Sequence, residues 1–96
     1  MTSIPFISLD DASTAPIYRQ IYEEIRRSIL SGEFVSGLQL PASRLLAEQL
    51  GVSRMTVMSA YEQLFAEGYL EGKVGSGTYV ASHLPEDFLQ LPKEAD

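Results

Sequence analysis

Residues 47–57 have the sequence AEQLGVSRMTV, which contains the end of one helical pattern and the beginning of another. Gly51 can adopt the positive φ that commonly ends a helix. Ser53 is a good N-cap, because its hydroxyl can accept a hydrogen bond from a free N–H of the following first turn. The stretch therefore predicts two helices joined by a short turn.

The second of these helices is expected to run from about Ser53 to Glu67, with Gly68 ending it. Apolar residues at helical spacing form its expected buried face: Val57, Tyr61, Leu64 and Phe65. Its outward positions are then Met55, Ser59 and Glu62, with Arg54, Thr56 and Met58 flanking the first turns.

The first helix of the pair is expected to begin near Ala42 or Ser43 and to end at Gly51. Leu46 and Leu50 share its inner face, with Leu45 at the edge. Arg44 and Glu48 point away from that face, where they are spaced for a surface ion pair worth only about 0.3 kcal/mol.

Behind the helix pair, residues 69–80 contain two short apolar runs around a glycine-rich tip, which predicts a β-hairpin. The alternation of Leu38-Gln39-Leu40 is typical of a short strand that could pair with this hairpin, ended by Pro41. A nucleotide-binding loop at residues 75–78 is disfavoured, because a strand pattern follows it rather than a helix. The fold class is therefore mainly α with a small β-hairpin, a winged helix-turn-helix, which is most often a DNA-binding domain.

Residues 16–31 predict a further amphipathic helix, with Pro16 in its first turn and Gly32 after its end. Isoleucines recur every fourth position, a stripe that indicates core, with a helix or dimer contact as the alternative. We expect an N-terminal arm at residues 1–15, the winged helix at residues 16–81 and the start of an interdomain linker at residues 82–96.

The 96 residues suffice for one small domain, and 45% hydrophobic content is ordinary for a globular one. The chain has no cysteine, no signal-peptide pattern and no apolar run approaching about 18 residues, so we expect a cytoplasmic protein without a membrane partner. The single histidine, His83, lies beyond the last predicted strand, and we expect no enzyme activity and no metal site.

The net charge of −6 is unexpected for a nucleic-acid binder. Much of the negative charge lies in the tail after His83, which contains four acidic residues and one lysine. Within residues 34–83 the three cations are Arg44, Arg54 and Lys73, all at positions of the helix pair or the hairpin. Local charge is what a DNA groove would meet.

Four segments resemble the winged helix of the GntR family: residues 40–44, LPASR; residues 47–57, AEQLGVSRMTV; residues 60–64, AYEQL; and residues 75–80, GSGTYV. Residues 16–22, PIYRQIY, and residues 84–87, LPED, are similar to the MocR-type members. That resemblance implies a regulator whose winged helix is joined by a long linker to an aminotransferase-like domain that binds pyridoxal phosphate. This downstream domain is not in the chain, so no cofactor is expected in it.

The resemblance implies DNA contacts at Arg44, Ser53, Arg54, Thr56 and Gly75, with position 55 also facing the groove. The sequence departs from the family pattern at two positions. Ala42 replaces a common serine cap, so that either Ser43 caps the helix instead or the helix begins weakly. Met55 replaces a polar residue. The predicted DNA-binding residues are Ser43, Arg44, Ser53, Arg54, Met55, Thr56, Lys73, Gly75, Ser76 and Gly77.

The chemistry of these side chains indicates which part of the DNA each one contacts. Arg54, near a helix N-terminus, can reach O6 and N7 of guanine, and Arg44 is placed to contact phosphate. Met55 and Met58 could contact thymine methyls or pack against a partner domain. Lys73 and Ser76 could touch phosphate or minor groove, although a plain tight turn is the alternative.

The function we expect is sequence-specific binding of a double-stranded DNA operator by a bacterial transcription regulator that is a homodimer at full length. One alternative is a protein-interaction module, motivated by the acidity and by the two methionines. Another is a YtrA-like GntR regulator with a short helical C-terminal segment, which Pro85 and Pro92 disfavour by interrupting a helix in the tail.

Overall fold

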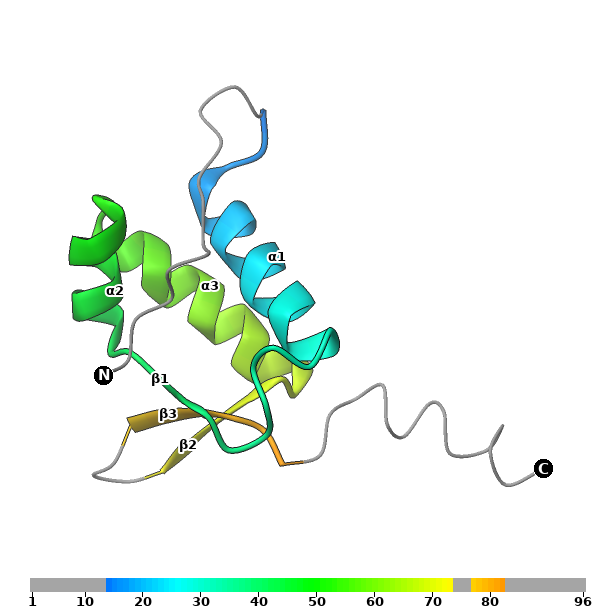
Figure 1. Ribbon diagram of the computed structural model, residues 1–96. Helices are drawn as coiled ribbons and strands as arrows, with labels where there is room; N and C mark the ends of the chain where they lie inside the picture. Colours follow the sequence, from blue (N-terminus) through cyan, green and yellow to red (C-terminus); the bar gives the residue numbers. More distant parts are fainter. Residues whose placement is uncertain (1–13, 74–76, 83–96) are drawn as a thin grey trace.

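The computed structural model describes residues 14–73 and 77–82. Its elements are, in chain order, α1 (Ile17–Leu30), β1 (Gln39–Leu40), α2 (Ser43–Leu50), α3 (Arg54–Glu67), β2 (Leu70–Lys73) and β3 (Gly77–Val80). Figure 1 shows α3 between α1 and α2, with the small sheet below the helices. Three helices and a three-stranded sheet confirm the predicted winged helix-turn-helix class.

Helix α1 matches the predicted helix within one residue at each end. Ile21, Ile25 and Ile29 are buried, which follows from their spacing of four residues along one helix face. Gly32, just past the helix, has a φ of +90°, a conformation that glycine adopts without strain. The isoleucine stripe is therefore core.

The turn between α2 and α3 has the predicted chemistry. Gly51 is left-handed, with a φ of +72°, and its N–H donates to the carbonyl of Ala47 at 2.9 Å. Ser53 is the N-cap of α3, and its side chain accepts a hydrogen bond from the N–H of Thr56 at 3.2 Å. Gly68 ends α3 with a φ of +90°. The short turn places the end of α2 next to the start of α3.

The sheet is antiparallel with strand order β1-β3-β2, so β3 is its central strand. The predicted strand near residues 38–40 is present and pairs with β3, with Gln39 opposite Tyr79 and Leu40 opposite Thr78. In the other ladder, Lys73 lies opposite Gly77. The hairpin tip at residues 74–76 lies outside the described residues.

The buried face of α3 differs from the prediction at one position. Three of the four residues predicted for this face are buried: Val57, Tyr61 and Leu64. The fourth, Phe65, is 39% exposed, and Ala60 is buried although it was not predicted to be. The buried stripe is narrow, and Phe65 lies at its margin, over strand β2. A Cβ built at Gly72 would lie 3.7 Å from the Phe65 ring, so the absent side chain of Gly72 leaves this ring uncovered on one side.

A hydrogen bond from α3 fixes the position of the chain between β1 and α2. The hydroxyl of Tyr61, buried on α3, donates to the carbonyl of Pro41 at 2.7 Å. Burial raises the pKa of Tyr61 far above its ordinary value, so this hydroxyl keeps its proton and remains a donor. The start of α2 is therefore held at a fixed place beside α3.

Candidate nucleic-acid interface

The first residues of α2 and α3 are in direct contact. The Nε–H group of Arg54 donates a hydrogen bond to the hydroxyl of Ser43, with 3.3 Å between the two heavy atoms. Ser43 is not the cap of α2: the N-cap residue is Ala42, which makes no side-chain capping bond. Of the two expectations for this helix start, a weak start without a side-chain cap is the one observed.

Arg44 follows Ser43 and is exposed. Within residues 14–73 and 77–82, ion pairs join Arg19 to Glu23 and Arg27 to Glu24, and none joins Arg44 to Glu48. The surface ion pair considered for Arg44 is therefore not formed. Arg44 in the first turn of α2 and Arg54 in the first turn of α3 are both exposed.

Ser53 and Thr56 form a small hydroxyl pair at the start of α3. Their side-chain oxygens lie 2.8 Å apart, in addition to the capping bond from the Thr56 N–H to Ser53. Ser53 lies just before the first turn and Thr56 within it, on either side of Arg54 in the sequence. The cap therefore also fixes the polar groups that α3 offers at its N-terminus.

The two methionines lie in different surroundings. Met55 is 69% exposed and borders a shallow groove of about 410 Å³ between the beginnings of α1 and α3, with Tyr18 on the opposite wall. Met58 is partly buried and lines a different groove, next to Ser43 and Tyr61. They do not form one apolar patch, and only Met55 projects fully from the surface.

Side-chain contacts also fix the base of the wing, which is the hairpin formed by β2 and β3. The ammonium of Lys73 lies 5.0 Å from the centre of the Tyr79 ring, a cation–π contact across the two strands. Gly77 has a φ of +133°, and a Cβ built there would lie 2.9 Å from the amide nitrogen of Gln39. Only glycine suits this position. The predicted contacts Gly75 and Ser76 lie outside the described residues.

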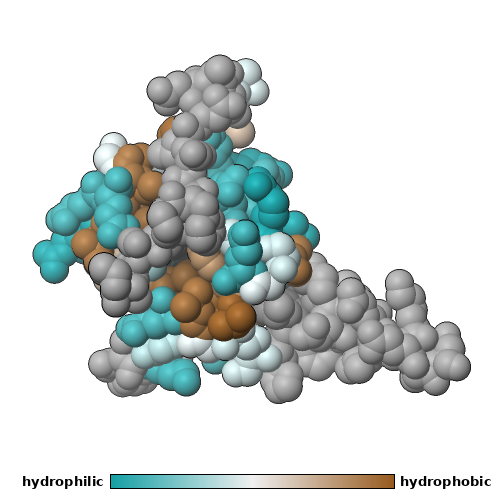
Figure 2. All heavy atoms as spheres, viewed as in Figure 1, coloured by the Kyte–Doolittle hydropathy of each residue, from teal (hydrophilic) through white to brown (hydrophobic). Residues whose placement is uncertain are grey.

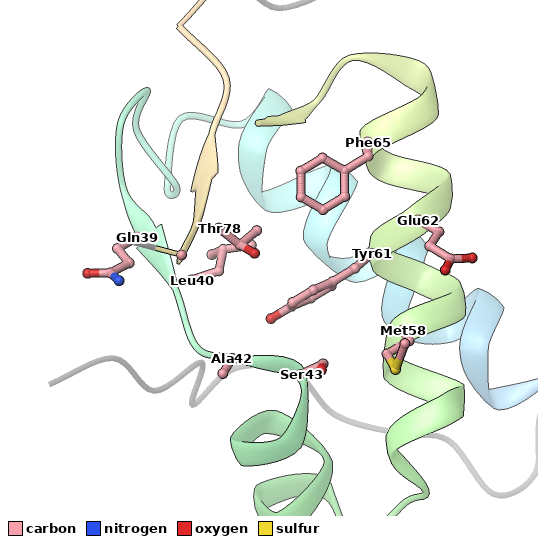
Figure 3. Close-up of a pocket in the computed structure, with 10 residues that line it drawn as sticks. Gln39, Leu40, Ala42, Ser43, Met58, Tyr61, Glu62, Phe65 and Thr78 are labelled. Carbon is pink, nitrogen blue, oxygen red and sulfur yellow. The ribbon is translucent and has the colours of Figure 1, made fainter. Parts of the chain in front are cut away.

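A groove of about 400 Å³ separates α3 from the sheet. Figure 3 shows Tyr61 and Phe65 projecting from α3 into it, toward Leu40 and Thr78, with Ser43 and Met58 at one end. Gln39 on β1 and Thr78 on β3 also border it, and neither was predicted as a site residue. Figure 2 shows apolar atoms reaching the surface above the sheet, among hydrophilic ones.

Comparison with known proteins identifies this arrangement. The family model for bacterial regulatory proteins of the gntR family matches residues 17–80, which span all the helices and strands of the structure. The chain belongs to the GntR family. The predicted family membership is thus confirmed, and the chain is a GntR-family DNA-binding domain.

Curated relatives in the GntR family are named as regulators. The probable rhizopine catabolism regulatory protein MocR of Rhizobium meliloti is 51% identical over 79 residues, which are 82% of this chain and 16% of MocR. The transcriptional repressor NagR of Bacillus subtilis is 40% identical over 84 residues, 88% of this chain and 35% of NagR. The chain thus spans about a sixth of MocR and a third of NagR. These names agree with the expectation that the chain is a regulator domain rather than an enzyme.

Solved GntR-family structures share the fold. YtrA from Sulfolobus acidocaldarius superimposes with a TM-score of 0.76 at 35% identity, over 93% of this chain and 94% of YtrA. The DNA-binding domain of AraR in complex with operator ORE1 has a TM-score of 0.66 at 35% identity, over 77% of this chain and 90% of AraR's.

Among the described residues of the present chain, no helix has the length and apolarity needed to cross a membrane.

Proposed function

We propose that this GntR-family domain reads a double-stranded operator for a MocR-type regulator. Helix α3 enters the major groove, Arg54 contacts a guanine, Arg44 contacts phosphate, and the wing around residues 75–77 lies on the backbone or in the minor groove. The 51% identity to MocR and the likeness to an AraR domain in complex with its operator support this assignment.

The observation that carries the proposal is the hydrogen bond between the first residues of α2 and α3, two helices that each have an exposed arginine in the first turn. The free N–H groups and dipole of a helix N-terminus attract phosphate. An arginine beside that phosphate can form two hydrogen bonds with O6 and N7 of guanine. The overall acidity of the chain does not oppose this, because affinity depends on the charges that the groove meets.

We further propose a homodimer at full length, in which two copies of α3 occupy successive major grooves. Linking two weak modules raises affinity by making the second contact intramolecular, so a single copy is expected to bind weakly. A cytoplasmic location goes with this proposal.

Pyridoxal phosphate belongs to the proposed downstream domain. The lysine among the described residues is Lys73, at the end of β2, and its ammonium lies 5.0 Å from the centre of the Tyr79 ring. Absorbance of the full-length regulator after loading with pyridoxal phosphate tests this part of the proposal.

The experiment that tests operator reading is fluorescence anisotropy on duplexes that tile the DNA upstream of the gene, at low and moderate salt. Arg54→Ala should cost about 1–3 kcal/mol on the preferred duplex and relax one base position, whereas Arg44→Ala should weaken all duplexes alike. Equal binding by wild type and Arg54→Ala, insensitive to salt, would contradict the proposal and favour a protein-interaction module.

A YtrA-like regulator is the second candidate, since this chain covers 94% of the YtrA chain. The length of the full gene product distinguishes the two. A product several times longer than 96 residues, as in MocR, supports the MocR type, whereas a product extended only by a short helical segment supports the YtrA type.

A further inference from the structure

We propose that Ser43 is a positioning residue for base recognition: its hydroxyl holds Arg54 by the Nε–H, so that the guanidinium presents its two Nη groups to one guanine. This inference rests on the proposed operator reading. It concerns how Arg54 is prepared before DNA arrives, and it assigns to Ser43 a role in specificity beyond simple contact with the backbone.

The geometry of the pair is set by the fold. Ser43 and Arg54 are eleven residues apart in sequence, and the hydrogen bond of 3.3 Å between them bridges the first residues of α2 and α3. The start of α2 is held from the other side, because the buried Tyr61 hydroxyl bonds to the Pro41 carbonyl at 2.7 Å. The serine hydroxyl therefore occupies a fixed position relative to α3, while the arginine is the flexible partner.

The chemistry of the guanidinium makes the point of attachment important. Arginine has five N–H donors in a planar fork, and it can offer either the Nη1/Nη2 edge or the Nε/Nη edge to a pair of acceptors. Because the Nε–H is bonded to Ser43, the Nε/Nη edge is occupied and the Nη1/Nη2 edge remains available to a guanine. A guanidinium held in this way also loses less side-chain entropy when it binds guanine O6 and N7.

Ser43 is free to serve in this way because it has no role in capping. The N-cap position of α2 is Ala42, and Ser43 already lies inside the helix. Alanine is a better helix former than serine by about 0.5 kcal/mol, so Ser43→Ala should not destabilise the fold. A loss of DNA recognition in that variant would then be a loss of positioning rather than of folding.

The test uses the operator located by tiling, with each guanine replaced in turn by 7-deazaguanine, which lacks the N7 acceptor. The guanine whose replacement weakens wild type but not Arg54→Ala is the partner of Arg54. Wild type should lose about tenfold in affinity there. Ser43→Ala should bind the natural operator about three- to fivefold more weakly and lose most of its discrimination at that guanine, while keeping its discrimination elsewhere.

Two further variants serve as matched controls. Ser43→Thr keeps a hydroxyl and should restore discrimination, and Ser36→Ala removes an exposed serine from the loop before β1 and should behave as wild type. Thermal unfolding of Ser43→Ala should match that of wild type.

Two results would overturn the inference. If Ser43→Ala weakens natural and substituted duplexes by the same factor, Ser43 contacts only the backbone; if it changes neither affinity nor discrimination, the hydroxyl has no role. If the proposed operator reading itself is wrong, the results differ. Arg54→Ala would then bind as wild type does, and no 7-deazaguanine replacement would weaken wild type more than Arg54→Ala.

Discussion

Met55 places an apolar side chain where a polar groove is expected. It is 69% exposed in the first turn of α3, between Arg54 and Thr56. The main apolar feature of the major groove is the C5 methyl of thymine. A thioether is flexible and polarisable, which suits a methyl contact. We therefore expect Met55 to favour thymine beside the guanine that Arg54 contacts.

Replacing thymine with deoxyuridine tests this directly, because it removes the methyl and leaves the hydrogen-bonding groups unchanged. One such replacement should weaken wild type by about two- to fivefold, the loss expected for one buried methyl group. Met55→Ser, which leaves no methyl group, should bind both duplexes equally. Val35→Ser is the control, since Val35 is also exposed, at 61%, but lies in the loop before β1. A thymine effect that persists in Met55→Ser would rule out the methyl contact.

Gly77 is required by its backbone rather than by the space around it. Its φ of +133° is strained for any L side chain, while the close Gln39 amide is the end of a flexible side chain that can move. Gly77→Ala should therefore cost about 1–3 kcal/mol in the free energy of unfolding, measured with urea. Adding Gln39→Ala should not restore it.

The matched control for this prediction is Gly72→Ala in the neighbouring strand. A Cβ at Gly72 meets only ordinary contacts, of 3.7 Å or more, with Phe65 and the Gly77 carbonyl, so its stability should change little or rise. Equal destabilisation by both alanines would contradict the assignment of strain to Gly77.

At the scale of single elements, α3 depends on its cap. Ser53→Ala removes the acceptor for the Thr56 N–H and should lower the free energy of unfolding by about 1 kcal/mol. Ser59→Ala, at an exposed interior position of the same helix, should be neutral or slightly stabilising. Equal effects in urea unfolding would argue against a capping role.

Ser53→Asp separates the cap from the interface. Aspartate is as good an N-cap as serine and interacts favourably with the helix dipole, so stability should be kept. The new negative charge lies beside Arg54 and would face phosphate, so DNA affinity should fall.

The helix boundaries followed from local chemistry, which is why they could be predicted: Gly51, Ser53 and Gly68 act through their own backbone and neighbours. Phe65 was wrongly placed in the core because periodicity gives the direction of a helix face but not its width, which depends on what packs opposite. The Arg54–Ser43 and Lys73–Tyr79 contacts depend on how separate elements cross, and no local pattern encodes that.

At the scale of the whole molecule, α1 is joined to the far end of α3 and to the wing. The hydroxyl of Tyr22 donates to the carboxylate of Glu67 at the end of α3. Arg26 donates from Nε to the hydroxyl of Tyr69 at 3.1 Å, and its guanidinium lies 5.5 Å from the centre of that ring. These contacts hold the end of α3 and the segment that leads into β2 to the same helix, α1.

Two buried tyrosines, Tyr22 and Tyr61, predict an alkaline limit to stability. Burial, followed by the hydrogen bond and negative charge of Glu67, raises the pKa of Tyr22 to about 12 from an ordinary value of 10.0. Between these values the unfolded chain has released the phenolic proton and the folded protein has not. The unfolded state therefore binds fewer protons, and the free energy of unfolding falls as pH rises above about 10.

Urea unfolding between about pH 9 and about pH 12 checks this expectation. Tyr22→Phe should flatten the decline, and Tyr61→Phe should also do so because burial raises the pKa of Tyr61 further still. Tyr18→Phe is the matched control on α1, since Tyr18 is only partly buried. A decline as steep in the Tyr22 and Tyr61 variants as in wild type would contradict the assignment.

The position of β3 at the centre of the sheet has a mechanical consequence. The chain leaves the sheet from this strand, whose two sides are bonded to β1 and β2, and the next N–H, of Ala81, donates to the Tyr69 carbonyl at 2.9 Å. A pull on the chain beyond residue 82 would load both ladders in shear, whereas a pull on an edge strand would open one ladder bond by bond. Tension applied there would thus reach both ladders together, and the sheet would resist it as a unit.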